Sequence, residues 1–205
     1  MFLKIKSIKR FSWLWLILLI LIGFGLVFGA FYYRNTISWK KAEDYYKTGQ
    51  YQKVVDEIGN LSMPQDARRL EIYGRSMMAV RELDKAYQAY EKLNSITNSL
   101  DSKLIMANIK SEKGDFETAE KIYLEIIDKN PQYIQTYLNL ASLYRIKGDQ
   151  VKANEILLKG VKNNPDSPSL YEYLLSINED KSKTAEYKDW SEKLKKLDPD
   201  NRRFQ

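Results

Sequence analysis

The sequence predicts an all-α protein in which one long apolar helix precedes a solenoid of about five repeated helical units. Residues 11–33 contain no charged side chain, and the segment that begins at Gly114 recurs in outline from Gly148. Three of the five prolines also stand 34 residues apart, at positions 131, 165 and 199. A fixed interval between similar segments is typical of stacked repeats, each of which is too small to bury a core alone.

The uncharged run over residues 11–33 predicts a transmembrane helix. A helix of this length extends about 34 Å, enough to cross a hydrocarbon layer of about 30 Å. Fourteen of its 23 residues are Leu, Ile, Val or Phe. Aromatic residues, which favour the membrane–water boundary, stand near its two ends: Trp13, Trp15, Tyr32, Tyr33 and Trp39. A cleaved signal peptide is the alternative, because the start is basic and Val27-Phe28-Gly29 before Ala30 is a tolerable cleavage pattern, although the apolar run exceeds the usual length.

Charges beside the apolar run predict its orientation. Residues 1–10 form a basic tail without acids, in which Lys9 and Arg10 directly precede the run. We therefore expect this tail in the cytoplasm and the rest of the chain outside the cytoplasmic (plasma) membrane, as a single-pass protein. Arg34, Lys40 and Lys41 follow the run, so the reverse topology, with the repeats facing the cytosol, remains an alternative.

Two glycines in the apolar run suggest a contact between membrane helices. Gly25 and Gly29 form a GxxxG pattern, which lets two helices approach closely. The pattern predicts a homodimer through this face, with a chance match as the alternative because glycine is common in membrane helices. No glycine or proline separates Ala30 from Gly49, so we expect the spanning helix to continue into the first helix of the array.

The region after the apolar run contains the repeated segments. Gly-Asp opens two of them, at 114–115 and 148–149, and Asn-Pro closes them at 130–131 and 164–165. Small residues recur at Ala86, Ala119 and Ala153, at intervals of 33 and 34. This period and these residues resemble the tetratricopeptide repeat (TPR), a helix-turn-helix unit. The resemblance is strongest in residues 67–165.

The resemblance implies a right-handed α-solenoid over residues 35–199, followed by a tail at 202–205. Its repeats would cover about 35–66, 67–99, 100–133, 134–167 and 168–201. The first and last depart from the pattern, as end repeats do. The last helix carries an apolar stripe suited to a terminal lid, made of Tyr187, Trp190, Leu194 and Leu197.

Each residue type of the pattern has a physical role. Small residues let paired helices pack closely, at Gly74, Ala86, Ala107, Ala119, Ala141 and Ala153. Gly114 and Gly148 suit the position after a helix, where φ is positive. Asn130 and Asn164 are expected to cap the helices that follow them. Residues 62–65, Ser-Met-Pro-Gln, indicate a capping box.

Composition argues against most chemistry. The chain has no His and no Cys, which removes the commonest general base, the commonest metal ligand and any disulfide. It contains no GxxxxGK[ST] or GxGxxG motif. Of its 33 Lys and Arg, five lie within residues 1–34, so beyond Arg34 the balance is 28 cations against 27 acids. We therefore expect no enzyme activity, no cofactor, no metal site and no nucleic-acid binding.

The TPR resemblance implies that the first helices of the repeats line a concave wall that binds peptides or helices of partner proteins. Repeat alignment places these residues on the wall: Trp39, Glu43, Arg68, Glu71, Arg75, Asp101, Leu104, Asn108, Gln135, Leu138, Asn139, Ser142, Ser169, Glu172 and Tyr173. As partner-binding residues we select Glu71, Arg75, Leu104, Asn108, Leu138, Asn139 and Arg145.

One TPR subclass grips a terminal carboxylate with two asparagines and several cations. Asn108 and Asn139 match those asparagines, but Leu104, Ser169 and Tyr173 stand where the cations belong. An unpaired carboxylate is costly, so we reject this clamp. Asn108 and Asn139 remain candidates for binding a peptide backbone, unless they are ordinary exposed residues.

Taken together, the sequence predicts a membrane-anchored scaffold or adaptor for protein partners, similar in layout to bacterial cell-envelope proteins that assist assembly or secretion. A cytosol-facing receptor of an organellar membrane, a secreted TPR protein and an enzyme or lipid-handling subunit are the alternatives.

Overall fold

The computed structural model describes residues 5–59 and 61–204, which form ten α-helices and two short 3-10 helices. The α-helices pair in chain order. Three-residue turns join the first four pairs, and a longer connection that contains the 3-10 helix Glu179–Lys181 joins the last pair. They are α1 (Ile5–Lys47) with α2 (Tyr51–Ile58), α3 (Ala67–Ala79) with α4 (Leu83–Thr97), α5 (Leu100–Glu112) with α6 (Phe116–Lys129), α7 (Ile134–Ile146) with α8 (Gln150–Asn163), and α9 (Pro168–Ile177) with α10 (Ala185–Leu197). The predicted fold class, an all-α solenoid of helix-turn-helix units after one long helix, is confirmed.

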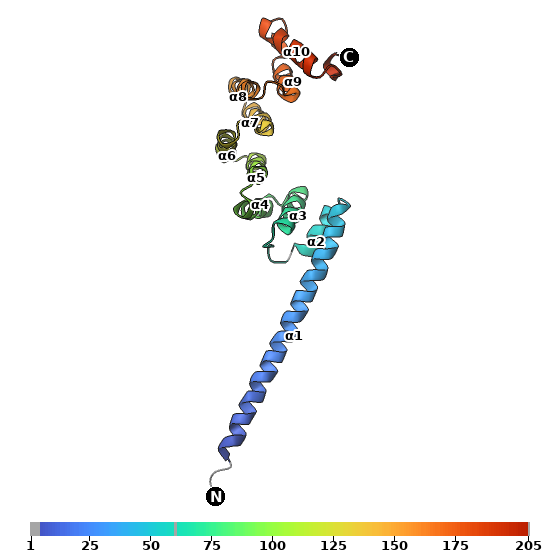
Figure 1. Cartoon of the computed structure of the whole chain (residues 1–205), viewed down its shortest axis with the longest axis vertical. Helices are drawn as coiled ribbons and strands as arrows, with labels where there is room; N and C mark the ends of the chain where they lie inside the picture. The colour runs from blue at the N-terminus through green and yellow to red at the C-terminus, as the bar shows by residue number, and fades with distance from the viewer. Residues whose placement is uncertain (1–4, 60, 205) are drawn as a thin grey trace.

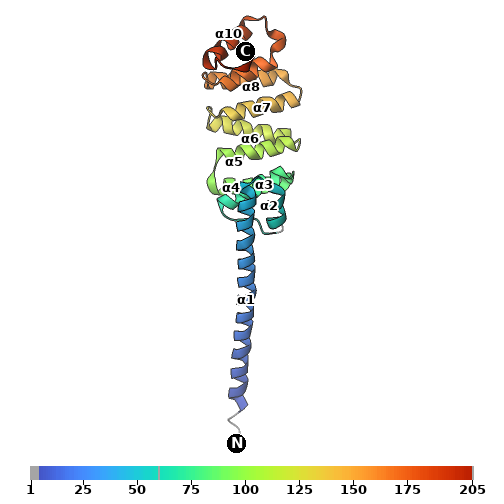
Figure 2. The same cartoon turned by 90° about the vertical axis from the view of Figure 1, so that its right-hand side faces the viewer.

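Helix α1 joins two environments without a break. Trp13 and residues 15–34 are exposed, whereas Trp39 and Ala42 are buried in the first unit of the array. The helix therefore runs from the apolar segment directly into the solenoid, as the absence of Gly and Pro predicts. Figures 1 and 2 show it as a single rod that leaves one end of the array. It begins at Ile5, inside the segment predicted as a tail.

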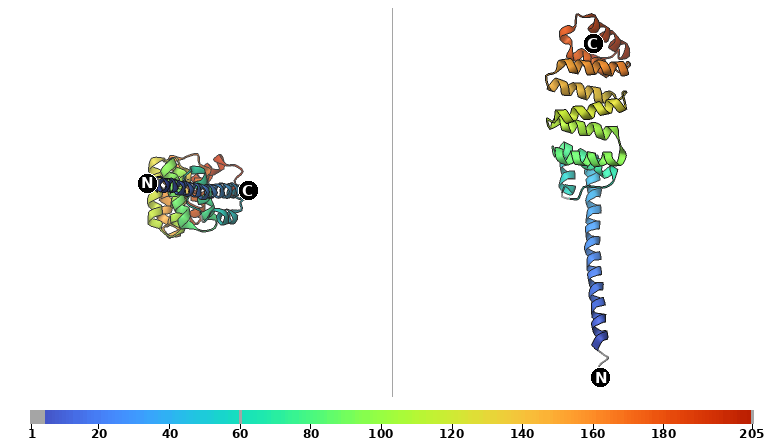
Figure 3. Two further views of the ribbon diagram at one scale, coloured as in Figure 1. Left: turned by 90° about the horizontal axis from the view of Figure 1, so that it is seen from below. Right: turned by 90° about the vertical axis from the view of Figure 1, so that its left-hand side faces the viewer.

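The helix pairs stack into an arc. Each helix packs against the helices before and after it in the chain. The odd-numbered helices α3, α5, α7 and α9 lie along the inner side of the arc, and α4, α6 and α8 lie along its outer side (Figure 1). Seen from the side, the helices lie across the long axis like rungs (Figure 3). The inner helices therefore supply the concave face.

Small residues allow this close stacking, as predicted. Ala86, Ala107, Ala119, Ala141 and Ala153 are fully buried at the crossings of paired helices. A Cβ atom added at Gly74 would stand 2.8 Å from Cε2 of Tyr90, so the tyrosine ring lies directly against the backbone of α3. Real Cβ atoms essentially never come this close, and the chain uses glycine here.

The Gly-Asp pair that opens the repeated segments has two local roles. Gly114 and Gly148 adopt φ values of 80° and 77°, which glycine reaches at little cost. The next residue caps the second helix, because Asp115 accepts from the amide of Thr118 at 3.3 Å and Asp149 from that of Lys152 at 3.0 Å. The capping role of the aspartates was not predicted.

The prediction that the asparagines of the Asn-Pro pairs cap the following helices is wrong. Asn130 and Asn164 end α6 and α8, and they do not cap the helices that follow. The Asn164 side-chain amide donates to the carbonyl of Pro131 at 3.3 Å, and the hydroxyl of Tyr137 donates to the same carbonyl at 2.9 Å. These side chains therefore tie one repeat to the next. The chain turns for three residues after each asparagine, which places it beyond the reach of a cap.

The predicted capping box at Ser62 is also wrong. Helix α3 starts later, at Ala67, and its cap is Asp66, whose carboxylate accepts from the amide of Arg69 at 3.0 Å. Gln65 donates instead to the carbonyl of Met63 at 3.2 Å.

The carboxyl end of the array is closed by α10. Leu194 is buried against Tyr171 and Leu175 of α9, and other side chains of the predicted stripe pack beside it. Residues Arg202–Phe204, expected as a tail, form a 3-10 helix in which Phe204 joins this cluster.

Candidate functional site

The concave face carries most of the side chains that repeat alignment placed there. Arg68, Glu71, Arg75, Asp101, Gln135, Ser169 and Glu172 are exposed, and Glu43, Asn108, Leu138, Asn139, Ser142 and Tyr173 are partly exposed. All belong to the inner helices α1, α3, α5, α7 and α9. The face is therefore mostly polar.

Two predicted wall residues lie in the core. The exposed fraction of Trp39 is 3% and that of Leu104 is 7%. Leu104 packs into the cluster shared by α5 to α9, and Trp39 into the cluster of the first units, beneath the guanidinium of Arg69 at 5.4 Å. Both residues belong to inner helices, but their side chains pack into the core and not on the concave surface. Leu104 is therefore withdrawn from the partner-binding set.

The structure brings Asn108 and Asn139 together. The Oδ1 atom of Asn108 accepts from Nδ2 of Asn139 and from the hydroxyl of Tyr123, both at 2.7 Å. Gln135 donates to Oδ1 of Asn139 at 2.8 Å. These amides form a linked row across α5 and α7, and their polar groups largely satisfy one another.

Two further predicted residues lie toward the carboxyl half of the face. Arg145 stacks on the ring of Tyr173, with 5.7 Å between guanidinium carbon and ring centroid, and its Nη1 lies 3.4 Å from the hydroxyl. Leu138 is partly buried against the core of α5 to α9.

The predicted residues Glu71 and Arg75 border a cleft between α3 and α5, which we call the Tyr90 notch. Its volume is about 430 Å³, and α4 forms its floor. It is lined by Ala67, Arg68, Glu71, Arg75, Tyr90, Leu93, Thr97, Ser99, Asp101, Ser102 and Ile105. Nε of Arg75 donates to Oε1 of Glu71 at 2.9 Å.

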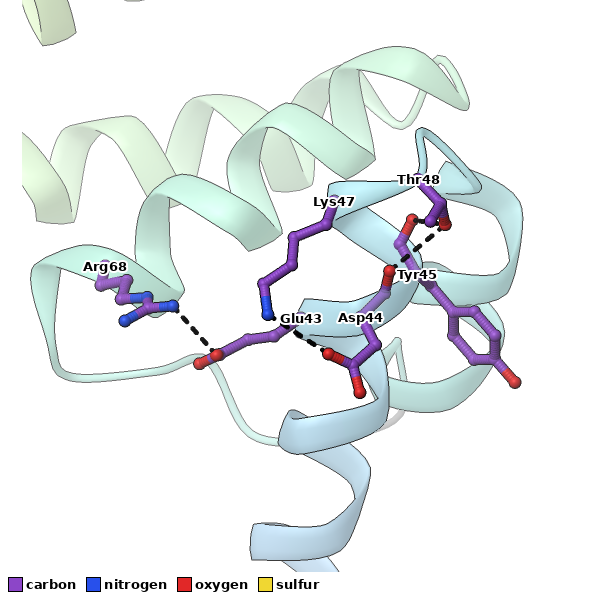
Figure 4. Close-up of polar contacts among 6 residues, drawn as sticks. All are labelled: Glu43, Asp44, Tyr45, Lys47, Thr48 and Arg68. Atoms are coloured by element: carbon purple, nitrogen blue, oxygen red, sulfur yellow. Dashed lines mark hydrogen bonds and ion pairs between the residues drawn. The ribbon is translucent and has the colours of Figure 1, made fainter.

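At the mouth of the notch, Arg68 connects α3 to α1. Its Nη2 donates to Oε2 of Glu43 at 3.1 Å (Figure 4). In the same view, Lys47 pairs with Asp44, and the Thr48 hydroxyl contacts the carbonyls of Asp44 and Tyr45 at the end of α1. Arg68 therefore already has a carboxylate partner, and Arg75 is the other cation of the notch.

Tyr90 is the notch residue that sequence reasoning missed. Its exposed fraction is 1%, and its hydroxyl oxygen is buried without a hydrogen-bond partner among the described residues. Burial raises its pKa to about 12, an effect that Arg75 opposes and Glu71 reinforces. A signal was present, since Tyr90 matches Tyr123 and Arg75 matches Asn108 at the same interval of 33 residues.

A cleft of about 550 Å³ on the outer helix α6 is bordered by acids, of which Glu120 and Glu125 pair with Lys147 and Lys103. Among residues 5–59 and 61–204, no group of three or more His, Cys, Asp or Glu is placed to hold a metal ion.

Comparison with known proteins places the fold. The sequence matches no protein-family model and no curated protein. Solved structures do match. "Crystal structure of MamA protein" is 17% identical, with a TM-score of 0.62 over 84% of this chain and 96% of that one. "MamA 41-end from Desulfovibrio magneticus RS-1" is 13% identical, with a TM-score of 0.62 over 82% and 97%. The likeness supports a TPR-like repeat fold.

The amino-terminal helix has the properties of a membrane span. Within the described residues one helix, over Trp15–Lys47, is long and apolar enough to cross a membrane, and none of its most apolar window is buried. A signal sequence near the amino terminus passes the same test of length and apolar character.

Proposed function

We propose that this protein is a non-catalytic, membrane-anchored scaffold that docks peptide segments or helices of partner proteins along the concave face of its repeats. The observation that carries the proposal is the continuity of α1. One helix links an exposed apolar segment to the buried residues Trp39 and Ala42 of the first repeat. Such a joint would hold a preformed binding wall close to a membrane surface.

The charge pattern supports a specific topology. With Lys9 and Arg10 in the cytoplasm, the repeats would lie outside the cytoplasmic membrane, which suits a role in cell-envelope assembly or secretion. A phosphatase that is active only outside the cytoplasm, fused at Gln205, tests this arrangement. Activity is expected, and its absence in an expressed fusion would favour the cytosol-facing receptor. A mature chain lacking residues 1–29 would instead favour the secreted form.

Photo-crosslinking in intact membranes tests the docking surface. A photoreactive amino acid at Glu172, exposed on inner helix α9, should capture a discrete partner band, because a groove buries part of its occupant. The matched controls are Leu124 and Leu158 on outer helices α6 and α8, which are also exposed. Equal capture from both faces, or none from α9, would contradict the proposal.

A homodimer through the membrane helix is a separate element of the proposal. Added Cβ atoms at Gly25 and Gly29 would meet nothing within 4 Å in the single chain, so these glycines leave a smooth helix surface. Replacing both by Ile should abolish chemical crosslinking between two chains in membranes, whereas Gly23→Ile, outside the motif, should not. Unchanged crosslinking of the double variant would exclude this interface.

A further inference from the structure

Two successive repeats bury a tyrosine at the same position, but the surroundings of its hydroxyl differ between them. Tyr90 of α4 and Tyr123 of α6 are 33 residues apart, as are Arg75 of α3 and Asn108 of α5. The Tyr123 hydroxyl donates to Oδ1 of Asn108 at 2.7 Å. A guanidinium has only donors. Arg75 therefore cannot accept the Tyr90 proton, and the Tyr90 hydroxyl has no partner among the described residues.

Arg75 also has unused donors. Its Nε is engaged by Glu71, whereas its two Nη atoms have no hydrogen-bond partner among the described residues. The side chains of Glu71 and Arg75 are 48% and 51% exposed. An ion pair this exposed contributes little to stability, so Glu71 can rotate away at small cost. The notch thus combines a cationic fork with a buried phenol that lacks an acceptor.

We propose that the Tyr90 notch binds an Asp or Glu side chain of the docked partner. The partner's carboxylate displaces Glu71 from the guanidinium, accepting hydrogen bonds from Nε and one Nη atom of Arg75 and from the hydroxyl of Tyr90. Charge-assisted bonds of this type are stronger than neutral ones, and a planar guanidinium binds a carboxylate with two parallel bonds. The apolar side chains of Leu93 and Ile105 border the site and reduce its exposure to water.

A similar arrangement is already present between α6 and α7. Glu120 of α6 accepts from the hydroxyl of Tyr144 at 2.9 Å and from Nζ of Lys147 at 3.2 Å. A buried tyrosine and a lysine, both from α7 and its end, thus bind one carboxylate of the neighbouring helix α6. The notch has the tyrosine and the cation, and the partner would supply the acid.

This inference rests on the proposed docking function, and its test uses the full chain in lipid nanodiscs with tyrosines labelled at ¹³Cζ. Two pools of capped pentapeptides serve as probes, randomised except for a central Glu in one and a central Gln in the other. The Glu pool should shift the Tyr90 resonance, assigned by its loss in Tyr90→Phe. It should bind about tenfold more tightly than the Gln pool, because the charged acceptor makes the stronger bond.

Variants separate recognition from a structural role of the ion pair. Arg75→Gln should weaken binding of the Glu pool by about tenfold. Glu71→Gln should strengthen it, because the internal competitor is lost. A merely structural pair predicts that both substitutions weaken binding. Lys159→Gln, an exposed charge loss on α8, should change neither pool.

Several results would overturn the assignment. If both pools bind equally tightly, or if they bind without moving the Tyr90 resonance, the notch does not select a carboxylate. Peptide binding elsewhere on the concave face would still agree with the docking function. If neither pool binds at millimolar concentration, the carboxylate site is refuted. The docking function is then judged by crosslinking from Glu172, which does not involve the notch.

Discussion

The second and third helix pairs differ at one point of contact, although their backbones repeat. In each, a tyrosine of the second helix is buried together with a small residue of the first: the Tyr90 ring lies against Gly74, and Tyr123 shares a buried cluster with Ala107. In the third pair the hydroxyl reaches Asn108, which also accepts from Asn139. In the second pair the matching residue is Arg75, and the hydroxyl is left without an acceptor.

This difference shows that repeat packing and polar pairing are separate constraints. The ring position follows from the stacking of helices, which requires a small residue opposite a large one. The partner of the hydroxyl lies at the solvent edge of the contact, where a substitution does not disturb the stack. A change of the residue that faces the tyrosine hydroxyl can therefore give one repeat a preference for a particular ligand group, while the stacking of the helices is kept.

The largest expected effect comes from removing the acceptor in the third pair. Asn108→Leu removes the acceptor of the Tyr123 hydroxyl and of Nδ2 of Asn139, so it should lower the free energy of unfolding by about 2–3 kcal/mol. Arg75→Leu, its counterpart, removes only an exposed ion pair and should cost less than about 1 kcal/mol. Urea titrations of the full chain in detergent, followed by circular dichroism, measure both. Equal losses would mean that the two contacts are equivalent after all.

The next effect concerns the small residue. In Gly74→Ala the new Cβ would meet the Tyr90 ring at 2.8 Å. Overpacking of this kind costs about 1–3 kcal/mol and exceeds the gain of about 1 kcal/mol in helix propensity. The net loss should appear in the same titrations, together with a shifted Tyr90 resonance. A more stable Gly74→Ala variant with an unmoved resonance would show that the ring has room to spare.

The contrast between packing and polar pairing also explains what the sequence could predict. Ala107 and Ala141 were assigned correctly because close helix crossings recur at the repeat interval and tolerate only small residues. Leu104 was misplaced because alignment gives the repeat position but not the rotation that separates the wall from the core. Asn164 was misread because its contact with Pro131 joins segments 33 residues apart. Tyr90 was missed because an absent acceptor is a property of a pair, not of one position.

Removing the two tyrosine hydroxyls should change the free energy of unfolding by a smaller amount and in different directions. Tyr123→Phe removes a satisfied hydrogen bond and should lower the free energy of unfolding by about 1 kcal/mol. Tyr90→Phe removes a buried hydroxyl without a partner, so stability should be unchanged or rise by up to about 1 kcal/mol. The comparison needs only the difference between the two variants. A similar loss in both would indicate that Tyr90 has found an acceptor, for example by rotation of Glu71.

The smallest expected difference is electrostatic and appears at alkaline pH. Burial raises the pKa of Tyr90 and of Tyr123 to about 12, and for Tyr90 the nearby Arg75 partly offsets this rise. Between pH 10 and 12 the folded chain therefore holds protons that the unfolded chain has lost, so stability present below pH 10 declines as the pH rises through this range. Arg75→Gln removes a cation that favours the phenolate and should raise the pKa of Tyr90 further, while that of Tyr123 stays in place. Titration of the two ¹³Cζ resonances measures both values in one sample. If Arg75→Gln moves neither resonance, the guanidinium lies too far from the phenol for the two to share a carboxylate.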